Sequence, residues 1–171
     1  MNDFPILLVE DDANDVFFFE RALRLAAVSH PLRVVRDGRE ALAYFTGDAP
    51  YCDRASCPLP VLVVLDLNLP QKTGLQVLKW IREHAPQKDV PVVILTSSTS
   101  LRDRQQADSL GATAYLIKPS EPDVLVEMVR QLKRNWLDDG HARWSGNNSG
   151  VKPATNANSS VPGFNPRPIS N

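Results

Sequence analysis

The sequence has few of the features that mark secreted proteins, proteins with cysteine-histidine metal sites or nucleic-acid-binding proteins. It contains only two cysteines, Cys52 and Cys57, which lie in one polar loop without a histidine nearby to complete a set of metal ligands. We therefore expect two reduced thiols, with a local disulfide as the alternative. The formal net charge is −1, so composition gives no electrostatic reason to expect a nucleic-acid or anionic-membrane partner.

Long apolar runs are also missing. No stretch approaches the roughly 20 apolar residues that a membrane-spanning helix needs. The N-terminus has an acidic residue before a short apolar run and no basic region, which favours a first strand over a signal peptide. We accordingly expect a cytoplasmic protein. A length of 171 residues without an internal repeat predicts one domain with a substantial core.

What the chain does contain is a regular alternation of short β-branched apolar runs with longer amphipathic segments. Strands are expected at residues 5–9, 32–36, 61–65, 92–96 and 113–117, and helices at 14–28, 38–46, 74–83, 101–110 and 121–137. This alternation predicts an α/β fold, a (βα)5 doubly wound parallel sheet. The first, third and fourth runs are continuously apolar, as expected of central strands that helices cover on both faces.

The composition changes after residue 137. Residues 138–171 are rich in Gly, Asn, Ser and Pro and poor in periodic apolar residues, which predicts a flexible C-terminal extension after a domain of residues 1–137. Four large apolar side chains in or near the extension have no evident packing site on a monomer: Trp136, Leu137, Trp144 and Phe164. Either they are exposed in a disordered end, or the extension is exchanged with a second copy in a dimer.

Polar side chains follow four of the expected strands at the point where each strand ends. In chain order these are Glu10, Asp11 and Asp12, then Asp66, then Thr96 and Ser97, and finally Lys118. The carboxyl ends of parallel strands meet at one edge of a sheet, so we expect these side chains to lie together. Crowded carboxylates need a compensating cation, and an oxygen-rich set with bound water suits Mg²⁺.

Such a set is suited to phosphoryl transfer. Asp66 can attack phosphorus, while Thr96 and Lys118 stabilise charge on the transferred oxygens. Each residue alone has a simpler explanation, since acids cap helices, aspartates form turns and lysines lie in loops. Their convergence at one edge of the sheet favours the phosphoryl-transfer interpretation.

Residues 4 to 137 resemble the receiver domains of two-component response regulators. The motifs that carry the resemblance are LLVEDD, VLDLNLPQKTGLQVL, VVILTSS and AYLIKP. The resemblance implies a CheY-like, flavodoxin-like sheet with strand order 2-1-3-4-5. It also implies a phosphorelay switch that accepts a phosphoryl group from a sensor histidine kinase on Asp66 with Mg²⁺ bound. Such a protein catalyses only its own phosphorylation and dephosphorylation and is otherwise not an enzyme.

The resemblance also assigns the metal ligands. Glu10 and Asp11 would be the acidic metal pair, Asp66 would add a carboxylate oxygen, and Asn68 would lend its backbone carbonyl. Asp12 would be a neighbour only. Glu10 replaces the more frequent Asp at its place, and its longer side chain can act through water.

Further residues are assigned to phosphate binding and switching by the same resemblance. Lys118 would pair with the phosphate, and Thr96 would be the hydroxyl that moves toward it. Tyr115 would alternate between exposed and buried positions. Pro119 would follow a cis peptide bond, which only X-Pro sequences adopt at low cost.

A narrower resemblance concerns the partner. Residues 47–60, the LNLPQKTG loop and RNWL at residues 134–137 resemble the small regulators of bacterial and cyanobacterial phytochrome kinases. This implies a phytochrome kinase partner, although the chain has no chromophore site of its own.

The first helix gives a separate indication of the partner surface. Ideal helix geometry groups five apolar residues on one side: Phe18, Phe19, Ala22, Leu23 and Ala26. Phe17 then points the opposite way, and we infer that Phe17 and Val16 form a docking edge for the helical bundle of the kinase.

No DNA-binding or catalytic pattern follows residue 137, so we expect output through protein contacts and no nucleic-acid or membrane partner. The face of the fourth and fifth strands and helices would bind a target or a second copy. Two alternatives stay open. One is a pseudo-receiver interaction module without phosphorylation, and the other is an aspartyl-nucleophile phosphatase. Such a phosphatase usually needs a second Asp two residues after the nucleophile, where this chain has Asn68.

Overall fold

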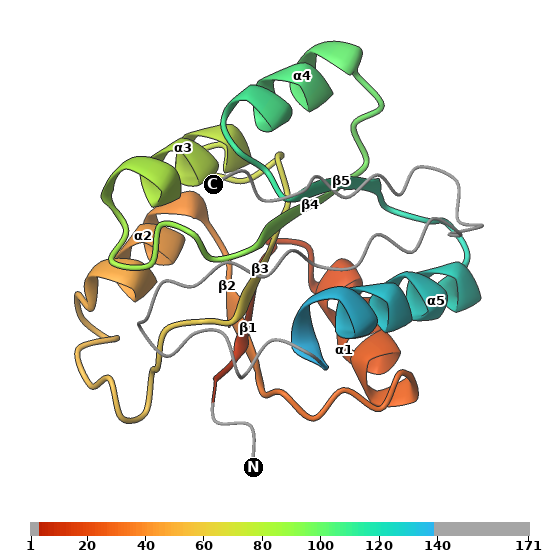
Figure 1. Ribbon diagram of the computed structural model, residues 1–171, viewed down its shortest axis with the longest axis horizontal. Helices are drawn as coiled ribbons and strands as arrows, with labels where there is room; N and C mark the ends of the chain where they lie inside the picture. The colour runs from red at the N-terminus through yellow and green to blue at the C-terminus, as the bar shows by residue number, and fades with distance from the viewer. Residues whose placement is uncertain (1–3, 139–171) are drawn as a thin grey trace, which may run out of the picture.

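The computed structural model describes residues 4–138 as a central parallel sheet covered by helices (Figure 1). The strands are β1 (Ile6–Val9), β2 (Leu32–Val35), β3 (Leu62–Leu65), β4 (Val92–Thr96) and β5 (Ala114–Ile117). The helices are α1 (Ala13–Leu25), α2 (Gly38–Thr46), α3 (Gly74–His84), α4 (Leu101–Ser109) and α5 (Pro122–Leu132), and α5 continues as the π-helix η1 (Lys133–Leu137). The strand order is β2-β1-β3-β4-β5, which confirms the predicted fold class and topology.

The sheet separates two apolar cores (Figure 1). Helices α1 and α5 cover one face and bury Phe19 and Val129, whereas α2, α3 and α4 cover the other and bury Phe45 and Leu78. Every residue of β1, β3 and β4 is buried, as the continuously apolar sequences predicted. The edge strand β2 buries only Val35. The sheet is therefore held in register by side chains on both of its faces.

The end of α5 differs from the prediction. We predicted one helix through residues 121–137, but the last part is a π-helix, in which the Asp138 amide donates to the Lys133 carbonyl at 2.9 Å. Leu137 is buried and Trp136 packs partly against the α1–α5 core, so the expectation that they lack a packing site is wrong. The reason is that they prolong the apolar stripe of α5 by one turn.

The predicted flexible or exchanged extension, with Trp144 and Phe164, lies outside the described residues apart from Asp138. Within residues 4–138, both cysteines are free thiols. None of the helices in this range is long and apolar enough to cross a membrane.

Candidate functional site

The candidate site lies at the carboxyl edge of the sheet, where β1, β3, β4 and β5 end. Backbone hydrogen bonds continue the sheet one residue past these strands. The Asp66 amide donates to the Val9 carbonyl at 3.1 Å, and the Lys118 amide donates to the Thr96 carbonyl at 2.9 Å. Glu10, Asp66 and Lys118 directly follow neighbouring or nearby strands of one sheet edge, and Thr96 is the last residue of β4, so the four residues lie along this edge as the sequence predicted.

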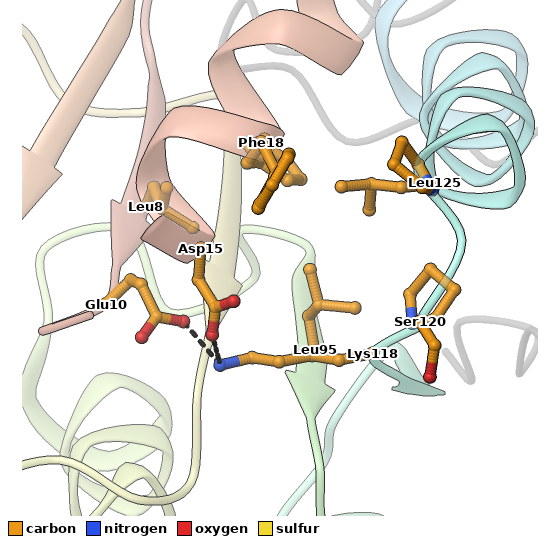
Figure 2. Close-up of a pocket in the computed structure, with 11 residues that line it drawn as sticks. Leu8, Glu10, Asp15, Phe18, Leu95, Lys118, Ser120 and Leu125 are labelled. Carbon is orange, nitrogen blue, oxygen red and sulfur yellow. Dashed lines mark hydrogen bonds and ion pairs between the residues drawn. The ribbon is translucent and has the colours of Figure 1, made fainter. Parts of the chain in front are cut away.

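Lys118 is the centre of the site. Its Nζ lies 2.7 Å from Glu10 Oε2, 2.7 Å from Asp15 Oδ2 and 2.7 Å from Asp66 Oδ2. Figure 2 shows the Lys118 side chain extending toward Glu10 and Asp15, with the two ion pairs dashed. The side chains of Glu10 and Asp66 are only 4% and 5% exposed, whereas that of Asp15 is 43% exposed. One ammonium thus compensates two buried carboxylates and one that water reaches.

The electrostatics follow from this arrangement. Burial lowers the pKa of Lys118, but its hydrogen bonds to Asp15, Asp66 and Glu10 together outweigh burial and raise the pKa. Burial raises the pKa of Glu10, against the opposite effect of Lys118 and with a further rise from the charge of Asp66. Lys118 is therefore fully protonated at neutral pH, and it is the group that makes a second buried carboxylate tolerable.

The loop after β3 holds Asp66 from the other side. Asp66 Oδ1 accepts a hydrogen bond from the Asn68 amide at 3.1 Å. The Gly74 amide donates to the Leu67 carbonyl at 3.0 Å, and a Cβ at Gly74 would lie 2.1 Å from the Asp66 carbonyl oxygen. Gln71 has φ +65°, in the left-handed region. The loop can fold back this closely on Asp66 because position 74 carries no side chain.

The residues assigned to metal binding are only partly brought together. Asp11 is exposed, and its backbone carbonyl accepts a hydrogen bond from Arg36 at 3.4 Å. Asp12 caps α1 by accepting from the Asn14 and Asp15 amides, at 2.7 Å and 3.2 Å. Across residues 4–138, no group of three or more His, Cys, Asp or Glu side chains is arranged to hold a metal ion.

The chemistry of the donors nevertheless fits a hard divalent cation. Glu10 and Asp66 are buried carboxylates that share one ammonium, and the exposed Asp11 is the residue after Glu10. Mg²⁺ keeps several waters and needs only one or two protein carboxylates. These carboxylates, with the carbonyl of Asn68, supply enough oxygens for such a site.

Thr96 and Tyr115 lie at the β4 and β5 side of the site. Thr96 is fully buried, and its Oγ1 accepts a hydrogen bond from the Ser98 amide at 3.3 Å. Tyr115 is in the buried position, and its hydroxyl donates to the Ser98 carbonyl at 3.0 Å. The Arg104 guanidinium carbon lies 5.6 Å from the centre of the Tyr115 ring. Burial raises the pKa of the Tyr115 phenol.

One expectation for this edge is wrong. In residues 4–138 the only cis peptide bond precedes Pro50, so the bond between Lys118 and Pro119 is trans. The resemblance alone suggested the cis form, and an X-Pro bond intrinsically favours trans by about 0.5–1 kcal/mol.

The docking edge also needs correction. Val16 is buried at 6% exposure, whereas Phe17 and Phe18 are 59% and 41% exposed, with ring centroids 5.7 Å apart. The residues that α1 buries include Val16, Phe19 and Ala22, so the buried stripe is centred closer to Val16 than the sequence grouping placed it, and Phe18 falls at its border. The exposed aromatic pair is Phe17 with Phe18. Phe18 also lines a cavity of about 80 Å³ that runs between α1 and α5 toward Lys118 (Figure 2).

Asp15 is the site residue that we missed. Asp15 does not stand at the end of a strand but in the first turn of α1, three residues after the Asp12 cap. The sequence did contain a signal for Asp15, because it is an acidic residue in the first helical turn after the acidic end of the first strand. Such an acid also favours the helix dipole, so the sequence alone did not separate the two explanations.

Comparisons with known proteins agree with this geometry. Residues 6–130 match the family model of the response regulator receiver domain. Response regulator Rcp1 of Synechocystis sp. is 35% identical over 133 residues, which cover 78% of this chain and 88% of that protein. The crystal structure of the phosphorylated cyanobacterial phytochrome response regulator RcpA has a TM-score of 0.73 at 34% identity, covering 80% of this chain and 95% of that one. The Mn²⁺-bound form of response regulator Rcp1 has a TM-score of 0.71 at 34% identity, covering 80% of this chain and 96% of that one.

Proposed function

Because the chain belongs to the response regulator receiver domain family and is similar to phytochrome response regulators, we propose that it accepts a phosphoryl group on Asp66 from a histidine kinase. The observation that carries the proposal is the setting of the Asp66 carboxylate. It is buried at the carboxyl edge of the sheet, with Lys118 on one oxygen and the Asn68 amide on the other. These contacts hold the carboxylate in a fixed orientation, which is what a positioned nucleophile requires.

The proposed transfer is a single displacement at phosphorus. A carboxylate oxygen of Asp66 attacks the phosphohistidine of the kinase, the new O–P bond forms, and the N–P bond breaks with its electron pair on the imidazole nitrogen. The Lys118 ammonium pairs with the transferred oxygens, and the Thr96 hydroxyl donates to one of them. Bound Mg²⁺, held by Glu10, Asp11, Asp66 and the Asn68 carbonyl, would neutralise further charge on the phosphoryl oxygens. A Mn²⁺-bound form of the relative Rcp1 supports a divalent-metal site.

We propose that the protein is cytoplasmic and that its partner is a sensor histidine kinase of the phytochrome type. The similarity to a phosphorylated phytochrome response regulator supports this choice. We propose that Phe17 and Phe18 contact the helical bundle of the kinase, since both are exposed on α1 and Phe18 lines the same pocket as Asp15 and Lys118. Phe17→Ala should slow phosphotransfer from the kinase but leave labelling by acetyl phosphate unchanged. Leu25→Ala, which removes an exposed apolar side chain at the far end of α1, is the matched control. Equal kinase rates for all three proteins would count against the docking surface.

Output through protein contacts is the remaining part of the proposal. The face formed by β4, β5, α4 and α5, with residues 138–171, would bind a target or a second copy. The mass in solution before and after phosphorylation, with and without residues 139–171, tests the dimer. The phosphatase alternative is weakened by Asn68, whose amide cannot exchange a proton at neutral pH as an acid or base.

The direct experiment is labelling with acetyl phosphate, with and without Mg²⁺, followed by mass spectrometry under acidic conditions. We expect a metal-dependent phosphate adduct on Asp66 that is base-labile and absent from Asp66→Asn, a change that removes the nucleophile at nearly constant shape. A folded wild-type protein that neither acetyl phosphate nor a phosphorylated phytochrome kinase labels would instead establish the pseudo-receiver alternative. Turnover of phosphate esters without a stable adduct would establish the phosphatase.

A further inference from the structure

Lys118 has no free donor in the structure. An ammonium group carries three hydrogens. Among the residues that the structure describes, Nζ donates to three carboxylates, on Glu10, Asp15 and Asp66, each at 2.7 Å. A phosphoryl oxygen on Asp66 can therefore reach Lys118 only if one of these three hydrogen bonds is given up.

The three partners differ in what their release would cost. The Glu10 side chain is 4% exposed, so a Glu10 carboxylate without Lys118 would be a buried and uncompensated charge. Asp66 is the phosphorylated residue and stays beside Lys118. The Asp15 side chain is 43% exposed, so water can replace the ammonium around it. Asp15 is the partner that Lys118 can leave most easily.

We propose that Asp15 is a positioning residue that holds Lys118 in the unphosphorylated state and exchanges with a phosphoryl oxygen when one arrives. The proposal rests on the function proposed above. Asp15 places Lys118 at the acceptor and at the same time competes with the phosphoryl group for its third hydrogen. It thereby sets how readily an anionic phosphodonor binds beside Asp66.

A simple helix-capping function explains the contact less well. Asp12 already accepts from the Asn14 and Asp15 amides and caps α1. The Asp15 carboxylate instead accepts from Lys118, whose side chain extends to it from the residue after β5, and lies beside Glu10 at the ammonium (Figure 2). Its contact joins residues that are 103 positions apart in the sequence, which a local capping function does not require.

The test is the concentration dependence of Asp66 labelling by acetyl phosphate in saturating Mg²⁺. In Asp15→Asn, the amide oxygen still accepts from Lys118 but without charge. We expect the half-saturating concentration to fall roughly fivefold, because charged hydrogen bonds are about twice as strong as neutral ones. The maximal rate should change less. Asp15→Glu, which keeps the carboxylate, should restore the wild-type value. Glu20→Gln, the same charge change at an exposed position of α1, should leave it unchanged.

Three outcomes would overturn the proposal: an unchanged or increased half-saturating concentration in Asp15→Asn, the same fall in Asp15→Glu, or the same fall in Glu20→Gln. A purely structural residue would lower the maximal rate instead. If the wild type itself is not labelled on Asp66, the proposed function fails, and not only the assignment of Asp15.

Discussion

Gly74 offers a sharp test of how the fold positions the acceptor. A Cβ at this residue would lie 2.1 Å from the Asp66 carbonyl oxygen and 2.8 Å from the Leu67 Cα. Both are backbone atoms, so the contact cannot be relieved by rotating a side chain. Ordinary contact distances are about 3.5–4.0 Å, so the two segments would have to separate by more than an ångström. Gly74→Ala should therefore move Asp66.

The expected magnitude combines two opposing effects. Overpacking of this kind costs about 1–3 kcal/mol. Gly to Ala at an unstrained helical position would stabilise the protein by about 0.4–1 kcal/mol. Since Gly74 is the first residue of α3 and has no left-handed φ, this second effect applies. We expect the free energy of unfolding to fall by about 1–2 kcal/mol, because the new Cβ meets backbone atoms and the overpacking cost then lies in the upper part of its range.

Urea unfolding measures this loss, and Gly38→Ala is the matched control. A Cβ at Gly38 would lie 2.4 Å from the Lys72 carbonyl oxygen, in the same loop but away from Asp66. Both variants should unfold at lower urea concentration than the wild type. Under conditions where both are folded, only Gly74→Ala should be labelled on Asp66 more slowly than the wild type. The reasoning is refuted if Gly74→Ala unfolds at the wild-type midpoint, or if both variants lose labelling equally.

Three further predictions concern other parts of the described structure. Leu137→Ala should lower the free energy of unfolding by about 2–4 kcal/mol, measured with urea, because it empties a buried position of the α1–α5 core. A loss of only about 0.5 kcal/mol, which is typical of surface substitutions, would contradict that packing. Arg54→Ala should destabilise the protein and speed proteolysis of residues 47–60, because Arg54 donates to the Tyr44, Phe45 and Cys57 carbonyls; unchanged cleavage would argue against this tether. Burial raises the pKa of Tyr44 to about 12, so the native state keeps a phenolic proton that the unfolded state loses near pH 10. The free energy of unfolding should therefore fall as pH rises from about 10 toward 12. Tyr44→Phe, which has no phenol to titrate, should show a shallower fall.

Much of the site could be predicted because it depends on topology. Continuously apolar runs identify β1, β3 and β4, and parallel strands bring their carboxyl ends to one edge of the sheet. Asp66 and Thr96 follow two of these runs directly, and Lys118 follows the fifth expected strand. Their meeting at one edge therefore requires only the strand order, not the details of any loop.

The errors arose where the result depends on the rotation of a helix about its own axis. Ideal periodicity grouped Phe18 with the buried residues and left Val16 outside, but the direction of α1 is fixed by the Asp12 cap and by packing against α5. The same rotation turns Asp15 toward Lys118 and exposes Phe17. A modest rotation of α1 about its axis would exchange the buried and exposed positions at the border of the apolar stripe, and the apolar pattern alone does not fix that rotation.

The contacts around Ser98 indicate how occupancy of the site can reach the surface. The Ser98 amide donates to Thr96 Oγ1, its carbonyl accepts from the Tyr115 hydroxyl, and its side chain donates to Asp103 Oδ2 at 2.6 Å. If the Thr96 hydroxyl turns to a phosphoryl oxygen, the Ser98 amide loses this acceptor, so the segment that also holds Tyr115 and the start of α4 is free to move. Of the nine residues in α4 only Ala107 is buried, so little apolar packing resists such a movement. The surface most responsive to phosphorylation should therefore be α4 and the Tyr115 end of β5, and not the well-packed α1–α5 layer.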